Sequence, residues 1–296
     1  MKKLSSYAGI FLLVVAACSN EPQIVSDVNN SDALVPVRVN VDGFSASQDD
    51  FPSTRVAEGV GSYSEINAVT LAFYNGSTEV EKITQLKSDP STYTTFGSFS
   101  LSLPMGSYTM VALAYYTNEN SVLTLTSPTE ASFSLRARET FAKTTEITIS
   151  STNAVDISLT LERIISQLRV VSTDGKTADV TNVRMTFSAG GKDFNPTTGF
   201  ALTNTGFANT VGNSVSVGTT SISSTILFLA TDEQTMNVTI ETLDAGGNTL
   251  FSKTVNNVSL KRNRRTTLTG AMYTNSGISG TFQVETGWLT ETNESF

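Results

Sequence analysis

Apolar and polar residues alternate along most of this chain, and this period of two limits its fold more than any other feature. In residues 34–42, LVPVRVNVD, the side chains of Val35, Val37, Val39 and Val41 share one face. A helix would repeat its apolar residues every three or four positions, whereas a half-buried strand repeats them every two. We therefore predict a half-buried strand at 34–42, and Pro36 places it at a sheet edge or a strand start.

The same alternation recurs in short segments that are separated by turn residues such as Asn75-Gly76 and Met105-Gly106. Helical spacing is nearly absent, so helices should be few and short. Many short strands with regular turn signals predict an all-β sandwich. The further strands are expected at 68–75, 78–86, 96–104, 107–116, 130–137, 143–150, 180–187, 225–230, 235–243, 248–259 and 265–273.

The division into domains is predicted from the segment 154–172, which alternates twice with a break in phase near Arg163. A strand that closes one domain, followed directly by a strand that opens the next, would give this pattern. We expect two β-sandwich domains in tandem, at 34–162 and 163–296, and the length of 296 residues suits two domains. Residues 43–65 lose the alternation and should form an exposed connector within the first domain.

The N-terminus has the layout of a secretory signal peptide. Lys2 and Lys3 precede an uncharged, mostly apolar run at 7–17. This run is too short to cross a bilayer, which takes about 20 residues. We therefore expect residues 1–17 to be removed on export.

Cys18, the only cysteine of the chain, follows this run directly. The sequence Val-Ala-Ala-Cys at 15–18 resembles a bacterial lipobox, which implies cleavage before Cys18 and attachment of acyl chains such as palmitate. Two or more chains would hold the protein stably in lipid, with residues 18–33 as a linker. An ordinary signal peptide with an incidental cysteine is the alternative. No aspartate follows Cys18 directly, which favours the outer membrane and the cell surface as destination.

Composition argues against several kinds of function. Histidine is absent, so neither a Ser-His-Asp triad nor a histidine-containing zinc site can form. The net charge of −8 disfavours nucleic acid. The basic cluster KRNRR at 261–265 could bind phosphate or a sulfated glycan, but a solvated turn or strand edge is the preferred interpretation. We expect no enzymatic activity, cofactor or metal, although two distant carboxylates could still meet as a glycosidase pair.

Two further segments could take part in assembly. Arg55 lies in the polar connector, where proteolysis concentrates, so a protease could cut between Arg55 and Val56; the alternative is a merely solvated arginine. Near the C-terminus, Ile278, Phe282, Val284 and Trp288 share one face of a candidate strand at 278–288. This strand could be donated to another copy, or it could be the last strand of the second domain.

The order of these pieces resembles the fimbrillin superfamily of Bacteroidetes, which comprises type V pilins with their anchor and tip subunits. The resemblance uses the lipobox, the strand at 34–42 and Arg55. It also uses LPMGSYTMVALAYY at 103–116, LTLERIISQLRVV at 159–171 and VSLKRNRRTTLTGAMYT at 258–274, and it ends at the Trp-containing tail. It implies transthyretin-like (Ig-like) sandwich domains and export as an outer-membrane lipoprotein.

The resemblance also implies how such a protein would act. An arginine-specific protease would cut at Arg55 and release the strand at 34–42, and a neighbouring subunit would fill the vacated groove. The protein would be a structural subunit of an adhesive fimbria with other fimbrial subunits as partners. Two alternatives stay open: an uncut anchor or tip subunit that keeps its lipid on Cys18, and a non-polymerising surface lipoprotein that binds a glycan or host ligand.

Overall fold

The computed structural model describes residues 33–45, 59–274 and 283–286, and its regular structure there is β-strand apart from one 3₁₀ turn, η2 (Pro90–Thr92). The strands are β1 (Leu34–Ser45), β2 (Ala68–Asn75), β3 (Thr78–Leu86), β4 (Ser98–Pro104), β5 (Gly106–Tyr115), β6 (Leu123–Ser127), β7 (Glu130–Phe133), β8 (Thr140–Ile149), β9 (Val155–Arg163), β10 (Ser166–Ser172), β11 (Asn182–Phe187), β12 (Asp193–Phe194), β13 (Phe207–Gly212), β14 (Ile222–Leu227), β15 (Glu233–Leu243), β16 (Thr249–Lys261), β17 (Arg265–Gly270) and β18 (Gln283–Thr286).

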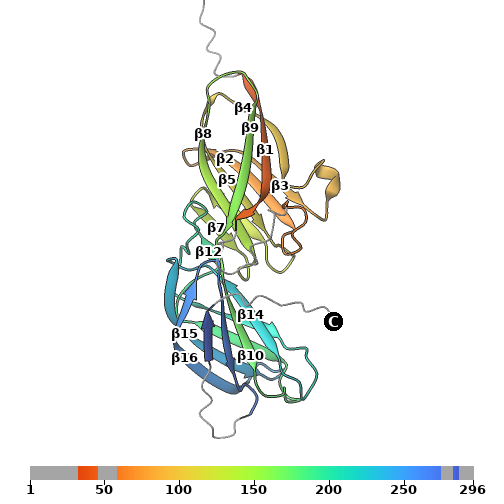
Figure 1. The fold of residues 1–296 in the computed structure, drawn as a ribbon, viewed down its shortest axis with the longest axis vertical. Helices are drawn as coiled ribbons and strands as arrows, with labels where there is room; N and C mark the ends of the chain where they lie inside the picture. The colour runs from red at the N-terminus through yellow and green to blue at the C-terminus, as the bar shows by residue number, and fades with distance from the viewer. Residues whose placement is uncertain (1–32, 46–58, 275–282, 287–296) are drawn as a thin grey trace, which may run out of the picture.

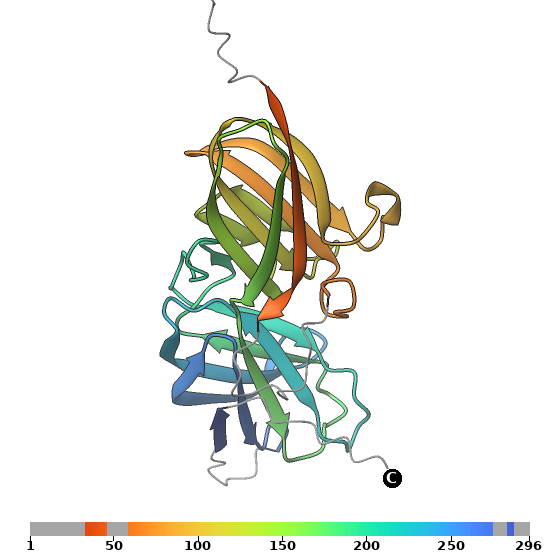
Figure 2. The ribbon, with the colours of Figure 1, turned by 45° about the horizontal axis from the view of Figure 1, so that its top comes forward.

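The strands up to β9, except β6 and β7, form one seven-stranded sheet with the order β3-β2-β5-β8-β9-β1-β4. Between its two halves, the pairing is short: Phe141 and Ala142 of β8 meet Arg163 and Glu162 of β9. The sheet therefore bends, and β9-β1-β4 lies over β2 and β5 (Figure 2).

The strands from β10 onward, except β12, form two four-stranded sheets in the other half of the elongated molecule (Figure 1). Their orders are β14-β10-β17-β18 and β13-β11-β15-β16. A small sheet, β12-β7-β6, combines strands from both parts of the sequence. Because β12 pairs with β7, the two halves are joined by backbone hydrogen bonds as well as by the chain itself.

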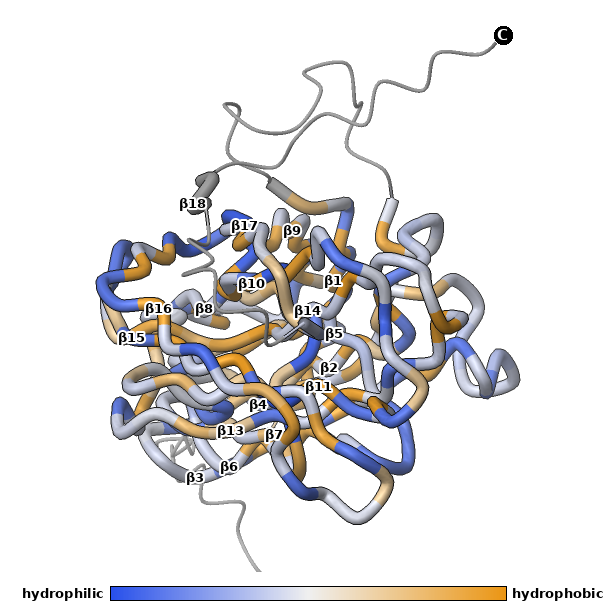
Figure 3. The backbone as a smooth tube through the Cα atoms, turned by 90° about the horizontal axis from the view of Figure 1, so that it is seen from below, coloured by the Kyte–Doolittle hydropathy of each residue, from blue (hydrophilic) through white to orange (hydrophobic). Residues whose placement is uncertain are grey.

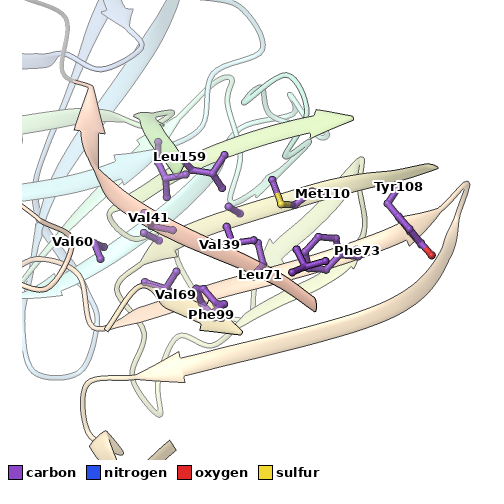
Figure 4. Close-up of a cluster of buried hydrophobic side chains, with 14 of the residues drawn as sticks. Val39, Val41, Val60, Val69, Leu71, Phe73, Phe99, Tyr108, Met110 and Leu159 are labelled. Carbon is purple, nitrogen blue, oxygen red and sulfur yellow. The ribbon is translucent and has the colours of Figure 1, made fainter. Parts of the chain in front are cut away.

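Three groups of buried side chains fill the spaces between these sheets. One lies inside the bent seven-stranded sheet, and Figure 4 shows Val39 and Val41 of β1 sharing it with Leu71 and Phe99. A second lies between the two four-stranded sheets. The third, which includes Phe194, lies between the halves. Hydrophilic residues gather mainly in the peripheral connections (Figure 3).

Two-residue alternation correctly predicted most of these elements. The hairpin at Asn75-Gly76 has the expected strand bounds, and Gly76 has the positive φ of 60° that its turn requires. The phase break near Arg163 separates β9 from β10, as expected. The prediction missed β6, β12 and β13, of which β12 is only two residues long.

The placement of the strand at 34–42 needs one correction. It is not a sheet edge, because β1 has β4 on one side and β9 on the other. The alternative position, a strand start, is correct for Pro36: this residue precedes Val37, where pairing with β9 begins. Proline is tolerated there because its missing N–H would have had no partner in β9.

Candidate functional site

The strand β1 occupies a slot between two other strands, and this slot is the candidate site. Leu34 to Asn40 pair antiparallel with β4, and Val37 to Ser45 pair parallel with β9. A bulge between Val41 and Gly43 shifts the register of the second pairing. Removing β1 would leave the facing backbone groups of β4 and β9 without strand partners, so that each strand would present an open edge to which another strand could pair.

The inward face of β1 is aliphatic from Val35 to Val41. Val35, Val37 and Val39 are 0% exposed and Val41 is 5% exposed. They contribute about 1.5 kcal/mol each at the lower end of the range for a buried aliphatic side chain, or roughly 6 kcal/mol together. The outward face contributes much less. Arg38 lies 3.3 Å from Asp156, but both side chains are more than half exposed, and such a pair is worth at most about 1 kcal/mol.

The end of β1 is held by a cluster of aromatic rings. Phe44 lies 4.0 Å from Phe141 and 5.3 Å from Tyr63, measured between ring centroids. Tyr63 and Phe141 meet edge to face at 5.6 Å. Such pairs add about 0.5–1.5 kcal/mol each beyond the area that they bury. Phe44 therefore fixes the point at which the chain leaves the slot.

A buried ion pair supports this cluster. Arg163 Nε donates to Glu139 Oε1 at 2.6 Å, and the two side chains are 3% and 11% exposed. The Arg163 guanidinium also donates to the Tyr63 hydroxyl and lies 5.0 Å from the ring of Phe141. Burial raises the pKa of Glu139 against the opposing effect of Arg163. Burial likewise raises the pKa of the Tyr63 hydroxyl.

Gly97 lets the chain pass close to β1 just before β4 begins. Its carbonyl accepts a hydrogen bond from Val41 N at 2.9 Å, and its N–H donates to Gln85 Oε1 at 2.8 Å. Its φ is +89°, and a Cβ there would lie 2.3 Å from Val60 Cγ1. Only glycine fits this position without displacing its neighbours.

The processing and lipid residues predicted from the sequence lie outside the described part of the chain. These are Cys18, Arg55 and Val56. The described chain ends at Ser45 and resumes at Gly59, so Arg55 lies on the connection that joins β1 to the rest of the protein. Cleavage at Arg55 and acylation of Cys18 stay predictions.

The predicted C-terminal strand is present in part as β18. It pairs antiparallel with β17, and Val284 lies opposite Leu268. Ile278, Phe282 and Trp288 lie outside the described residues. The described part of β18 has four residues, against the twelve of β1.

The chain just before this C-terminal segment is held by one carboxylate. Asp174 accepts hydrogen bonds from the backbone N–H groups of Met272, Tyr273 and Thr274 at 2.7–2.9 Å, and from the Thr274 hydroxyl at 3.0 Å. Burial tends to raise the pKa of Asp174, but these hydrogen bonds together outweigh it and lower the pKa.

The basic cluster at 261–265 forms the turn between β16 and β17. Lys261 and Arg262 form ion pairs with Glu233 and Asp232 at 3.1 and 2.8 Å. Arg265 Nε donates to Gln167 Oε1 at 2.5 Å. Two of its cations are thus paired with carboxylates, in agreement with the turn interpretation.

The described segments contain neither a metal-ligand cluster nor a membrane-spanning helix. Within 33–45, 59–274 and 283–286, no three His, Cys, Asp or Glu side chains gather to hold a metal. The same segments contain no helix of the length and apolarity needed to span a membrane.

Comparison with known proteins identifies the family of the chain. A family model described as a family of unknown function, DUF6562, matches residues 44–295. The chain belongs to the DUF6562 family. No curated protein matches this DUF6562 member.

Solved structures resemble the DUF6562 chain over most of its length. The fimbrial anchor protein Mfa2 from Porphyromonas gingivalis matches with a TM-score of 0.52 at 9% identity, covering 86% of this chain and 97% of Mfa2. Two candidate adhesins from Bacteroides ovatus match with TM-scores of 0.51 and 0.50 at 9% and 12% identity. Those alignments cover 84% and 82% of this chain and 95% and 88% of the adhesins. The expected resemblance to fimbrial proteins of Bacteroidetes is thereby confirmed at the level of the fold.

Sequence reasoning missed the residues that hold the end of β1. Tyr63 is far in the sequence from Glu139 and Phe141, and no motif links it to them. Arg163 alone gave a signal, since it marks the phase break, but the sequence did not show that its guanidinium is buried beside β1.

Proposed function

We propose that this protein is a structural subunit of a cell-surface fimbria, exported as an outer-membrane lipoprotein, which assembles by exchange of β1. The observation that carries the proposal is the position of β1: an apolar strand inside a sheet, joined to its domain by a connection that contains Arg55. The fold that the chain shares with the fimbrial anchor protein Mfa2 supports it. The lipobox supports export, with lipid on Cys18.

Two β-sandwich domains of transthyretin-like type are part of the proposal, with their boundary at 162–166. One buried cluster uses residues from Val35 to Leu161, and another uses residues from Leu168 to Tyr273. This separation along the sequence favours two units, each with its own core. The small sheet that joins β12 to β7 would then act as a bridge between the domains.

Cleavage after Arg55 would cut β1 loose from its domain without breaking any strand. Its departure would open a groove about 40 Å long, since a strand rises about 3.3 Å per residue. Four aliphatic pockets and two rows of backbone groups would face water there. A strand from a second copy would fill these pockets and pair with the two rows of backbone groups. A head-to-tail contact of this kind extends into a filament.

The C-terminal segment of a neighbouring copy is the proposed donor. The slot holds four valines, so the donor register should conserve their total volume. Ile278, Gly280, Phe282 and Val284 satisfy this, because glycine offsets the larger phenylalanine. A register that used Phe282, Val284, Thr286 and Trp288 would be far bulkier. We therefore assign the slot to residues 278–284, and β18 must leave β17 before donation.

Limited proteolysis of the full mature chain tests the proposal. A trypsin-like protease should cut after Arg55 and produce SDS-resistant ladders, because exchanged strands dissociate slowly. Arg55→Ala should abolish both the cut and the ladders. The matched control Arg38→Ala changes an arginine of β1 whose side chain faces solvent, and it should leave both intact.

A second pair of variants tests the donor register. Phe282→Ala should suppress the ladders, whereas Trp288→Ala should leave most of them. A product that stays monomeric after cutting at Arg55 would contradict strand exchange. Mass analysis of native surface material separates the subunit types: a stalk subunit begins at Val56, and an anchor keeps acylated Cys18.

A further inference from the structure

The end of the seven-stranded sheet at which β1 begins has no charged residue in its connections. Three connections end there: Gly76-Ser77 between β2 and β3, Met105 between β4 and β5, and residues 150–154 between β8 and β9. The last of these reads Ser-Ser-Thr-Asn-Ala, and all five of its residues are exposed. This end therefore presents small neutral groups to solvent.

Strand β1 starts at the same end. Leu34 lies opposite Pro104, the last residue of β4, and Gly106, the first residue of β5, lies opposite Ile149 of β8. Figure 2 shows the first residues of β1, in red, at the top of the molecule with these connections. We call Leu34 together with the three connections the linker end, because residues 18–33 join the chain there.

The linker end is apolar as well as uncharged. Leu34 is 64% exposed, more than any other large apolar residue of the described segments. Met105 and Val155 are half-buried and pack against the core of the seven-stranded sheet. An apolar, neutral surface can approach lipid without the cost of stripping water from a charge.

The lack of charge is not a general property of this chain, whose net charge is −8. In the other half of the molecule, the connection between β15 and β16 contains Asp244. The connection between β16 and β17 contains Arg262 and Arg264. The linker end thus differs from other turns of the same protein in the property that decides contact with lipid.

The chain that precedes β1 limits how far the linker end can lie from a lipid anchor. Residues 18–33 are sixteen residues, and an extended chain covers at most about 3.6 Å per residue, so they reach no further than about 60 Å. Acyl chains on Cys18 would keep the linker end close to the bilayer, at a high effective concentration. Even a small apolar contact can then orient the protein.

We propose that the linker end rests on the lipid surface that holds the acyl chains of Cys18, an inference that rests on the lipoprotein part of the proposed function. Leu34 and Met105 enter the interfacial layer, and the neutral connections contact the headgroups. Strand β1, with its twelve residues, then points away from the membrane. At about 3.3 Å per residue, Phe44 and the connection that contains Arg55 stand about 40 Å from the lipid, within reach of a protease.

Fluorescence quenching of the full acylated chain in phosphatidylcholine vesicles tests this orientation. Because lipid occupies the sulfur of Cys18, a cysteine introduced by Ser151→Cys is the only free thiol and takes an environment-sensitive dye. The matched position is Ala245→Cys, exposed in the connection between β15 and β16. Lipids with a spin label near the headgroup should quench the dye at position 151 about threefold or more strongly than the dye at position 245.

A pair of leucine variants locates the contact. Leu34→Asp should reduce the quenching at position 151 about threefold, because a charge must then approach the lipid. Leu135→Asp changes a leucine of matched exposure, 63%, that follows β7, and it should leave the quenching unchanged.

Equal quenching at positions 151 and 245, or none at position 151, would overturn the proposal. So would a signal that depends on protein density and not on the spin-labelled lipid, since this would indicate contact with a second copy. Mass analysis of the same sample reports the acyl chains separately: an acylated protein without quenching refutes the orientation alone, whereas an unacylated protein refutes the lipoprotein assignment as well. Ladder formation needs no vesicle, so strand exchange succeeds or fails independently.

Discussion

If the inward valines hold β1 in its slot, shortening them should destabilise the protein far more than changing their outward neighbours. The test variant is the double substitution Val37→Ala with Val39→Ala, and both residues are 0% exposed. The matched control is Arg38→Ala with Asn40→Ala on the exposed face of the same strand. Both variants shorten side chains at two alternate positions of the same strand, so they differ mainly in which face of β1 they change.

The expected magnitude follows from the burial of the two side chains. Each Val→Ala change removes two methyl groups, worth about 0.8 kcal/mol each in transfer from water. The cavity that remains adds roughly 1 kcal/mol per site, because a packed core relaxes only partly. The double variant should therefore lose about 4–6 kcal/mol of unfolding free energy. The control removes one exposed ion pair and should lose at most about 1 kcal/mol.

Urea unfolding of the full mature chain, followed by circular dichroism of the strand signal, measures both values. Domains typically have only 5–15 kcal/mol of stability, so the double variant should unfold at a much lower urea concentration. Equal losses in the two variants would show that the valines do not hold the strand. A loss below about 1 kcal/mol in the inward variant would refute the reasoning in the same way.

Three further outcomes follow from the structure. Glu139→Ala should cost about 3–5 kcal/mol in urea unfolding, because it removes the carboxylate that pairs with the buried guanidinium of Arg163; a loss under 1 kcal/mol would contradict this. Gly97→Ala should lower the unfolding free energy by roughly 2–5 kcal/mol, because the φ of Gly97 is positive and an added Cβ would meet a methyl group of Val60. The control Gly59→Ala places its Cβ in open space and should leave the unfolding free energy nearly unchanged in the same assay. The lowered pKa of Asp174 means that its hydrogen bonds add fully to the unfolding free energy above the unfolded-state pKa of about 3.9, and that this contribution is lost as the pH falls through the folded-state pKa. When the unfolding free energy is measured at decreasing pH, Asp174→Asn should therefore lose less of it than the unchanged protein. An equal loss in both would contradict the role given to Asp174.

The sequence predicts strands well and their neighbours poorly, for a physical reason. Alternation records which face of a strand is buried, and this located β1 closely. It contains no record of which strand lies alongside, so the interior position of β1 was not predicted. The pattern also fails where both faces are buried. Along β2, Val69 packs into one core and Ala68 into another, so the strand reads as a continuous apolar run.

The residues of the candidate site also divide into those that the sequence predicts and those that it does not. The inward valines of β1 were identified from their spacing alone. Glu139, which follows β7, gives no signal of burial in the sequence, because a charged residue near other charged residues is normally expected to be solvated. Its role depends on Arg163 and on the contact of Arg163 with Tyr63, which only the folded chain brings together.

The parallel pairing of β1 with β9 has a consequence for the order in which the chain acquires structure. Val37 meets Val155 across this pairing, so the first strand to be synthesised waits for one that emerges more than a hundred residues later. Such non-local contacts form slowly, and the apolar face of β1 stays without its β9 neighbour throughout that interval. The inward valines of β1 can therefore be fully covered only after β9 has been synthesised.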